Sequence, residues 1–271
     1  MSKEVSLRSP PRRAAAAFTL VELLVVVAIV GLLGAMTAAA VTRAKAKALQ
    51  TQCSGNLRQL GQALQLFVTD QHQYPLALNP GGSTGQYSSH KNTWMTTLQR
   101  TASDSPSTTS EWLHKGMWDC PSAGRPDTFG SGEGYAEYGY NVYGLGTTPT
   151  GFTYGLGGHI DTERSDVNSA RPVAESDVVA PAQMMAMGDG FAGNNGVIRD
   201  GLSLLQRKVS VEDYHGSTSR SRSRHRGLAN VVFCDGHVEA IPLVTLFDSL
   251  DASALQRWNS DNQPHAEFLR P

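Results

Sequence analysis

The longest apolar run in the chain extends from Phe18 to Val41, 24 positions with a single charged side chain, Glu22. About 20 apolar residues in a helix are enough to cross the ~30 Å hydrocarbon core of a bilayer. The run therefore predicts a membrane-spanning helix. A carboxylate inside such a span is costly without a partner, so Glu22 is a candidate functional residue.

A second hydrophobic pattern follows the span. Apolar residues recur at spacings of three and four, which is the pattern of one face of an α-helix. No proline interrupts residues 18–70. We therefore expect one continuous helix of about 80 Å, at ~1.5 Å per residue. The apolar positions of its second half are Leu49, Cys53, Leu57, Leu60, Leu64 and Phe67.

From Gln71 onward, glycine, proline, serine, threonine and aromatic residues occur in short runs without a helical period. This pattern predicts strands and loops. The expected fold is α+β, with a helix at 18–70 whose amphipathic half packs on a β-rich head at 71–271. Residues 1–17 form a separate basic leader.

The clearest predicted element of the head is a hairpin at 230–241. Asp235-Gly236 suits a two-residue turn, in which both positions have φ > 0. The strands on either side alternate apolar and polar residues. The pairs expected to face each other are Phe233 with Val238 and Val231 with Ala240.

Charge around the span predicts its orientation. The leader has a net charge of +3, whereas residues 18–271 carry 19 basic and 23 acidic side chains. Positive charge before a span keeps that end in the cytoplasm, so the head is expected outside. The mild negative charge of the remainder gives no reason to expect a nucleic acid partner.

A secretory signal peptide would explain some of the same residues. The basic start, the apolar segment and the small residues at 38–40 are its usual parts. However, the apolar run is longer than the 7–15 residues typical of a signal peptide, and a carboxylate within it would serve no purpose. Cutting the chain just before Phe18 would instead create a positive amine as a partner for Glu22.

The segment FTLVELLVVVAIVG resembles the cleavage and methylation signature of type IV pilins and type II secretion pseudopilins. The resemblance implies that a prepilin peptidase cuts between Ala17 and Phe18 and that the Phe18 amine is N-methylated. It also implies that Glu22 neutralises the amine of an adjacent subunit during filament assembly. The family has glycine before the cut. Ala17 is the smallest substitute, so cleavage is expected, at a slower rate.

A second resemblance lies near the C-terminus. In RHRGLANVVFCDGHVEAIP, His225 is followed by nine residues and then by Asp235 and Gly236. This is similar to the H-x9-DG motif that closes a large bacterial subfamily of prepilin-like proteins. Other segments fit the same subfamily: TQCSGNLRQLGQAL on the helix, WDCPS at 118–122, YGYNVYG at 138–144 and VVAPAQMMAMGDG at 178–190.

Several side chains of the head are candidate metal ligands. His225, Asp235 and His237 could bind a metal, and Asp189 or Asp200 could join a calcium site with backbone carbonyls. No EF-hand spacing of carboxylates supports such a site, and a hairpin turn accounts for Asp235-Gly236. We expect no metal and no cofactor, and keep Asp189 and Asp235 as calcium candidates.

The three cysteines, Cys53, Cys120 and Cys234, are expected in an oxidising compartment. Three thiols allow at most one disulfide within the chain. Cys53 lies on the apolar stripe of the helix, so a Cys53–Cys120 disulfide would attach a loop of the head to the helix.

No catalytic motif stands in a supporting context, so no enzyme activity is expected. The sequence predicts a filament subunit of a type II secretion or type IV pilus system, with one span in the inner membrane and its head in the periplasm or outside. Its expected partners are pilin-like subunits, the prepilin peptidase, an inner-membrane assembly platform and the bilayer. The alternatives are a tethered binding protein that never polymerises and a secreted hydrolase.

Overall fold

The structure is a computed structural model, which describes Ala39 only through its backbone. The described residues are 18–76, 94–103, 115–122, 138–142, 144–145, 154–158, 171–189, 224–246 and 251–268. The chain divides into two compact units, Met1–Lys45 and Ala46–Pro271. The boundary between these units falls within the first helix.

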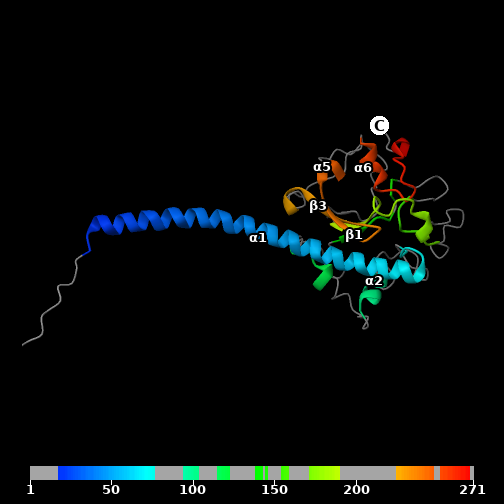
Figure 1. The fold of residues 1–271 in the computed structure, drawn as a ribbon, viewed down its shortest axis with the longest axis horizontal. Coiled ribbons are helices and arrows are strands. Elements are labelled where there is room, and N and C mark those ends of the chain that lie inside the picture. Colours follow the sequence, from blue (N-terminus) through cyan, green and yellow to red (C-terminus); the bar gives the residue numbers. More distant parts are fainter. Residues whose placement is uncertain are drawn as a thin grey trace, which may run out of the picture. The chain divides into compact units, whose positions relative to one another are not determined.

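Helix α1 extends from Leu20 to Gln71 (Figure 1). The continuous helix expected from the two hydrophobic patterns is therefore confirmed. Apart from Ala39, whose side chain is not described, every residue of its apolar half is exposed, and large apolar side chains such as Leu20 and Val41 are 78% and 65% exposed. In the second half, Cys53, Leu57, Leu60 and Leu64 are fully buried, as the stripe predicts, and Val68 extends it.

The second unit contains short helices and a sheet besides the end of α1. The helices are α2 (Trp94–Ala102), α5 (Leu243–Leu246) and α6 (Ala252–Gln256), with single 3-10 turns at Gly116–Trp118, Glu175–Asp177, Arg224–Arg226 and Ala266–Phe268. The strands are β1 (Tyr138–Tyr140), β2 (Met185–Asp189), β3 (Leu228–Phe233) and β4 (Val238–Pro242). With α1, these elements confirm the predicted α+β class.

The four strands form one antiparallel sheet in the order β1-β2-β3-β4. Tyr140 pairs with Met187 across β1 and β2. A bulge interrupts the pairing of β2 with β3 between Met185 and Met187. This order places β2 and β3 in the middle, where every residue of β2 is buried.

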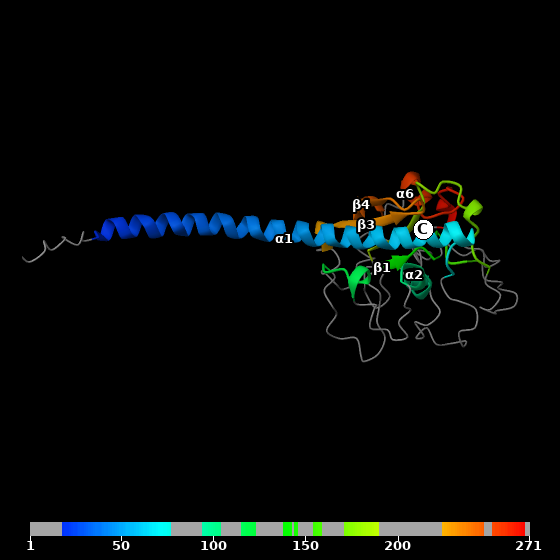
Figure 2. The same ribbon diagram turned by 60° about the horizontal axis from the view of Figure 1, so that its bottom comes forward.

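One face of the sheet packs on the amphipathic part of α1. This core contains Leu57, Leu60 and Leu64 from α1 together with Tyr140 and Val232 from the sheet. Figure 2 shows β3 and β4 running beside this part of the helix. The apolar stripe of α1 thus forms part of the core of the head.

The opposite face of the sheet is covered as well. Phe233 and Ile241 pack there with Leu246 of α5 and with Leu255 and Trp258 at α6. Figure 1 shows α5 and α6 on the side of β3 that faces away from α1. The head therefore has three layers, with the sheet in the middle.

The hairpin is present, but its predicted register is wrong by one residue. Val232 pairs with Val238 and Val231 with Glu239. The loop has three residues, because the Phe233 N–H donates to the His237 carbonyl at 2.9 Å and the Gly236 N–H to the Phe233 carbonyl at 2.9 Å. Only Gly236 has positive φ, +89°. This is a tight turn closed by a left-handed glycine, a common form of three-residue hairpin loop.

The hairpin turn also contacts α1 closely. A Cβ on Gly61 would lie 3.0 Å from Val232 Cγ1 and 3.1 Å from the Gly236 carbonyl oxygen. In addition, Gln65 Nε2 donates to the Cys234 carbonyl. The turn is therefore held on the helix, and both faces of β3 are buried where one apolar and one polar face were expected.

Candidate functional site

At the start of α1, Glu22 forms hydrogen bonds with Thr19. The Glu22 N–H donates to Thr19 Oγ1 at 3.2 Å, and Glu22 Oε2 accepts from the Thr19 N–H at 2.9 Å and from the Thr19 hydroxyl at 2.7 Å. This reciprocal arrangement is a capping box, in which a threonine and a glutamate three residues later satisfy unpaired N–H groups of the first helical turn. Glu22 thus has a local partner before any cleavage.

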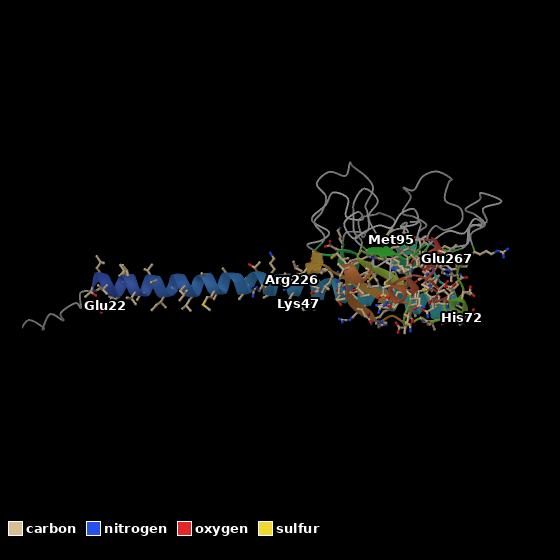
Figure 3. All side chains as sticks on the ribbon, turned by 90° about the horizontal axis from the view of Figure 1, so that it is seen from above. Glu22, Lys47, His72, Met95, Arg226 and Glu267 are labelled. Atoms are coloured by element: carbon tan, nitrogen blue, oxygen red, sulfur yellow. The ribbon has the colours of Figure 1, made fainter. Side chains whose placement is uncertain are left out.

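Both side-chain bonds of Glu22 use Oε2. The other oxygen, Oε1, can therefore accept from a further donor while the capping box stays formed. Figure 3 shows Glu22 at the N-terminal end of α1, where the side chains extend away from the ribbon. Phe18 is 70% exposed, and Ala17 lies outside the described residues.

The two ends of the H-x9-DG motif lie at opposite ends of β3. His225 precedes the strand and Asp235 follows it. Six strand residues separate the two by roughly 20 Å, so they do not share a site. Asp235 Oδ1 is instead 2.6 Å from His237 Nδ1, at the exposed turn.

His225 belongs to a buried cluster. Its Nε2 lies 3.2 Å from Asp189 Oδ2 and 3.7 Å from Cys120 Sγ. Ligand atoms of Cys53, Cys120 and His225 all lie within 4.8 Å of one another. The side chains of His225 and Asp189 are fully buried. We call Cys53, Cys120, Asp189 and His225 the thiol–histidine cluster.

Each member of the thiol–histidine cluster comes from a different segment. Cys53 lies on the buried stripe of α1, and Cys120 follows the 3-10 turn at Gly116–Trp118. Asn56 Nδ2 donates to the Asp119 carbonyl at 2.7 Å and so fixes that turn on α1. Asp189 ends β2, where its Oδ2 accepts from the Asn230 N–H at 2.8 Å. His225 lies in the 3-10 turn at Arg224–Arg226, just before β3.

Electrostatic interactions change the pKa of two members of the cluster, His225 and Cys53. Burial lowers the pKa of His225, but hydrogen bonds and negative charge from Asp189 and Cys120 outweigh burial and raise this pKa to about 9. Hydrogen bonding with Cys120 lowers the pKa of Cys53, although burial opposes that change. In contrast, burial raises the pKa of the third thiol, Cys234, to about 12.

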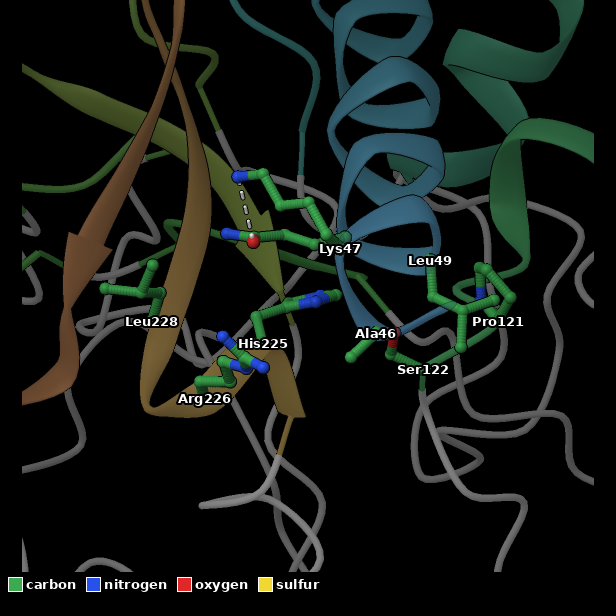
Figure 4. A pocket seen from close by; sticks show the side chains of 9 residues that line it. Ala46, Lys47, Leu49, Pro121, Ser122, His225, Arg226 and Leu228 are labelled. Atoms are coloured by element: carbon green, nitrogen blue, oxygen red, sulfur yellow. Dashed lines mark hydrogen bonds between the residues drawn. The ribbon is translucent and has the colours of Figure 1, made fainter. Parts of the chain in front are cut away.

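A cavity of about 470 Å³ adjoins His225. Figure 4 shows His225 and Arg226 on one side of it and α1 on the other, where Lys47 Nζ donates to Gln50 Oε1 at 3.4 Å. Its remaining lining residues are Ala46, Leu49, Pro121, Ser122 and Leu228. Of the thiol–histidine cluster, His225 lines this cavity.

The structure brings together some of the predicted site residues and separates others. Asp189 and Asp235, the calcium candidates, bond to different partners: Asp189 to His225 and Asn230, and Asp235 to His237. Asp200 lies outside the described residues. Cys53 and Cys120 are neighbours, as a disulfide requires, but all three cysteines are thiols in this structure. The disulfide remains a prediction.

Two features of the candidate sites were not predicted from the sequence. The capping box could have been found, because threonine followed three residues later by glutamate is its ordinary signature. The grouping of His225 with two cysteines had no sequence signal, because its members lie on segments joined only by the fold.

Comparison with known proteins gave one match. Residues 12–38 match the family described as the prokaryotic N-terminal methylation motif. Neither the comparison with curated proteins nor that with solved structures found a match. Within the described part of the chain, α1 is the one helix long and apolar enough to cross a membrane. The motif and this helix support a type IV pilin-like family and suggest a membrane-anchored, single-pass protein.

Proposed function

We propose that this chain is a filament subunit, a pilin or pseudopilin of a type IV pilus or type II secretion system. The inner membrane holds it by residues 18–41, with the leader in the cytoplasm and the head outside. After cleavage, its partners are other pilin-like subunits and the inner-membrane assembly platform. It acts by assembly and performs no catalysis.

The observation that carries this proposal is the overlap of the methylation motif with an exposed apolar helix. The match covers residues 12–38, and the apolar half of α1 within it has no buried residue. Apolar surface of this extent is stable only against lipid or against other apolar helices. A pilin helix meets these two environments in turn, first in the bilayer and then in the filament.

Glu22 and Phe18 connect cleavage with assembly in this proposal. Cutting before Phe18 creates an amine next to Thr19, whose own N–H already bonds Glu22 Oε2. In this proposal, Oε1 pairs with the Phe18 amine of the same chain or of a neighbour. Pairing allows the amine to enter an apolar filament core, because a buried charge needs a counter-charge.

The mature N-terminus tests the proposal. The protein is isolated from membranes of cells that contain a prepilin peptidase, and its first residues are determined by mass spectrometry. We expect the mature chain to start at Phe18 with a methylated amine. An uncut chain would favour the tethered binding protein, and a start near Val41 would favour a secreted protein released by signal peptidase.

Variants at the junction sharpen this test. Ala17→Gly should speed cleavage several-fold, and Ala17→Leu should block it, because the peptidase must fit a small residue before the cut. Ala16→Leu is the matched control, since it adds the same side chain one position earlier, and should be cut like the parent. Equal processing of all these chains would contradict cleavage at Ala17–Phe18.

A further inference from the structure

We propose that Cys53, Cys120 and His225 bind a zinc ion that fastens helix α1 to the head. Two thiolates and an imidazole are a common zinc ligand set. The three side chains are buried, and their ligand atoms lie within 4.8 Å of one another. This site is independent of the filament function and concerns how the head is held together.

The separation of Cys120 and His225 matches zinc geometry. A tetrahedral ion with Zn–S near 2.3 Å and Zn–N near 2.0 Å places sulfur and nitrogen ligands about 3.5 Å apart. Cys120 Sγ and His225 Nε2 are 3.7 Å apart. Asp189 Oδ2 is 3.2 Å from the same nitrogen, close to the spacing of about 3.3 Å between nitrogen and oxygen ligands. The Asp189 carboxylate therefore lies beside the proposed nitrogen ligand.

Hydrogen bonds within the head leave part of this cluster unsatisfied. Asp189 Oδ1 and His225 Nδ1 are buried and have no hydrogen-bond partner among the described residues. Unsatisfied polar atoms on fully buried side chains are rare, and an ion or a water molecule bound beside them often supplies the missing partner. Nδ1 is the ring nitrogen that a zinc ion on Nε2 would not contact, whereas Asp189 Oδ1 belongs to the carboxylate that lies beside Nε2.

The backbone at His225 is strained. His225 has φ +50° and Arg226 φ +60°, followed by Gly227 at φ +82°. Left-handed conformations are uncommon outside glycine and persist where the surrounding structure enforces them, often at functional sites. In this left-handed conformation, the His225 imidazole lies in the cluster, just before the first residue of β3.

The ligand chemistry selects the ion. Thiolates prefer soft or borderline ions such as zinc, whereas calcium and magnesium take oxygen ligands. Zinc would neutralise two buried thiolates and displace their protons to solvent on binding. A disulfide between Cys53 and Cys120 would use the same sulfurs but would leave His225 without a role. The experiment must therefore separate these two outcomes.

The test uses the full chain, purified in detergent with a reductant that does not bind metal. Cobalt(II) is added as an optical probe for the zinc site. We expect a thiolate-to-cobalt charge-transfer band, d–d absorption typical of four-coordinate cobalt, and saturation at one ion per chain. Zinc should displace the cobalt and raise the melting temperature, and a chelator should reverse both effects.

Variants identify the ligands. Cys53→Ser, Cys120→Ser and His225→Gln should each weaken cobalt binding by more than about 100-fold, since even outer-shell changes at metal sites cost 10–100-fold. Cys234→Ser is the matched control. It removes a thiol that is as buried as Cys53 and Cys120 and belongs to the same core, and should leave binding unchanged.

Three results would overturn the proposal. The first is a fully reduced parent chain that gives no charge-transfer band, a result that does not depend on any variant folding. The second is a band that survives in both Cys53→Ser and Cys120→Ser. The third is protein from the exported compartment that contains a Cys53–Cys120 cross-linked peptide and no zinc by elemental analysis.

Discussion

At the scale of single residues, Glu22 combines two physical roles. Its carboxylate closes a capping box with Thr19, which starts α1, and in our proposal it also neutralises an amine in the filament. A capping box needs a hydrogen-bond acceptor that glutamine also provides, whereas neutralisation needs a negative charge. Substitutions can therefore separate the two roles.

We predict that filament assembly follows the charge of residue 22. Glu22→Leu should remove both roles and give no filaments, and Glu22→Gln should keep the capping box but give far fewer filaments. Thr19→Ala keeps the charge and loses only the cap, worth about 1 kcal/mol of helix stability, so it should assemble nearly like the parent. Surface filaments are counted by electron microscopy, and membrane levels are checked by blotting.

Two outcomes would contradict this prediction. Normal filaments from processed Glu22→Leu protein would show that the carboxylate has no part in assembly. A loss of filaments in Thr19→Ala as complete as in Glu22→Gln would show that the start of the helix, and not the charge, is what assembly requires.

At the scale of elements, the contact between α1 and the β3–β4 turn holds the hairpin in place. Gly61 approaches Val232 and the Gly236 carbonyl, and Gln65 bonds the Cys234 carbonyl. Gly236 has φ +89°, which residues other than glycine rarely adopt. The DG half of the H-x9-DG motif therefore has a structural role in the turn.

We predict that Gly236→Ala destabilises the head by at least about 1–2 kcal/mol, the cost of a left-handed conformation for an ordinary residue. The added Cβ would also lie 3.0 Å from Gln65 Cγ. At ~2–4 °C per kcal/mol for a domain of this size, the melting temperature should fall by several degrees. Thermal unfolding of the full chain in detergent measures the change.

Gly55→Ala is the matched control for that substitution. Gly55 lies in α1 and has no atom within 4 Å of an added Cβ, so alanine should stabilise the helix by about 0.5–1 kcal/mol. The two Gly→Ala changes should thus have opposite signs. An unchanged or higher melting temperature for Gly236→Ala would contradict the role assigned to the turn.

At the scale of the whole molecule, the charges that flank the apolar span control its expected orientation. Residues 1–17 carry four basic side chains, and Arg43, Lys45 and Lys47 follow the span. Basic residues near the ends of a span favour the cytoplasmic side. Because the counts differ by little, the orientation should be sensitive to loss of the leader charges.

We predict that replacing Lys3, Arg8, Arg12 and Arg13 by glutamine mixes or inverts the orientation, since the downstream cations then dominate. Replacing Arg43, Lys45 and Lys47 by glutamine is the control and should leave the head outside. Alkaline phosphatase fused after Pro271 reports an exported head by its activity. Full phosphatase activity in the leader variant, at equal expression, would show that the leader charges do not determine the orientation.

The long helix and the turn could be predicted from the sequence, because their signals are local. Each signal is read from neighbouring residues of the sequence. The signals are an apolar run that matches the bilayer thickness, apolar residues spaced by three and four, and an Asp-Gly pair. Their consequences in the structure are α1, its buried stripe at Leu57, Leu60 and Leu64, and a hairpin at the expected position. For the same reason, the capping box could also have been predicted from the sequence.

Only the tertiary structure decided the register of the hairpin and the composition of the buried cluster. A loop of three residues in place of two shifts each pair by one, and contacts of the turn with Gly61 and Gln65 accompany the three-residue form. Cys53, Cys120, Asp189 and His225 come from four separate segments. They meet because the sheet packs on α1, and no short-range pattern encodes which side chains share that interface.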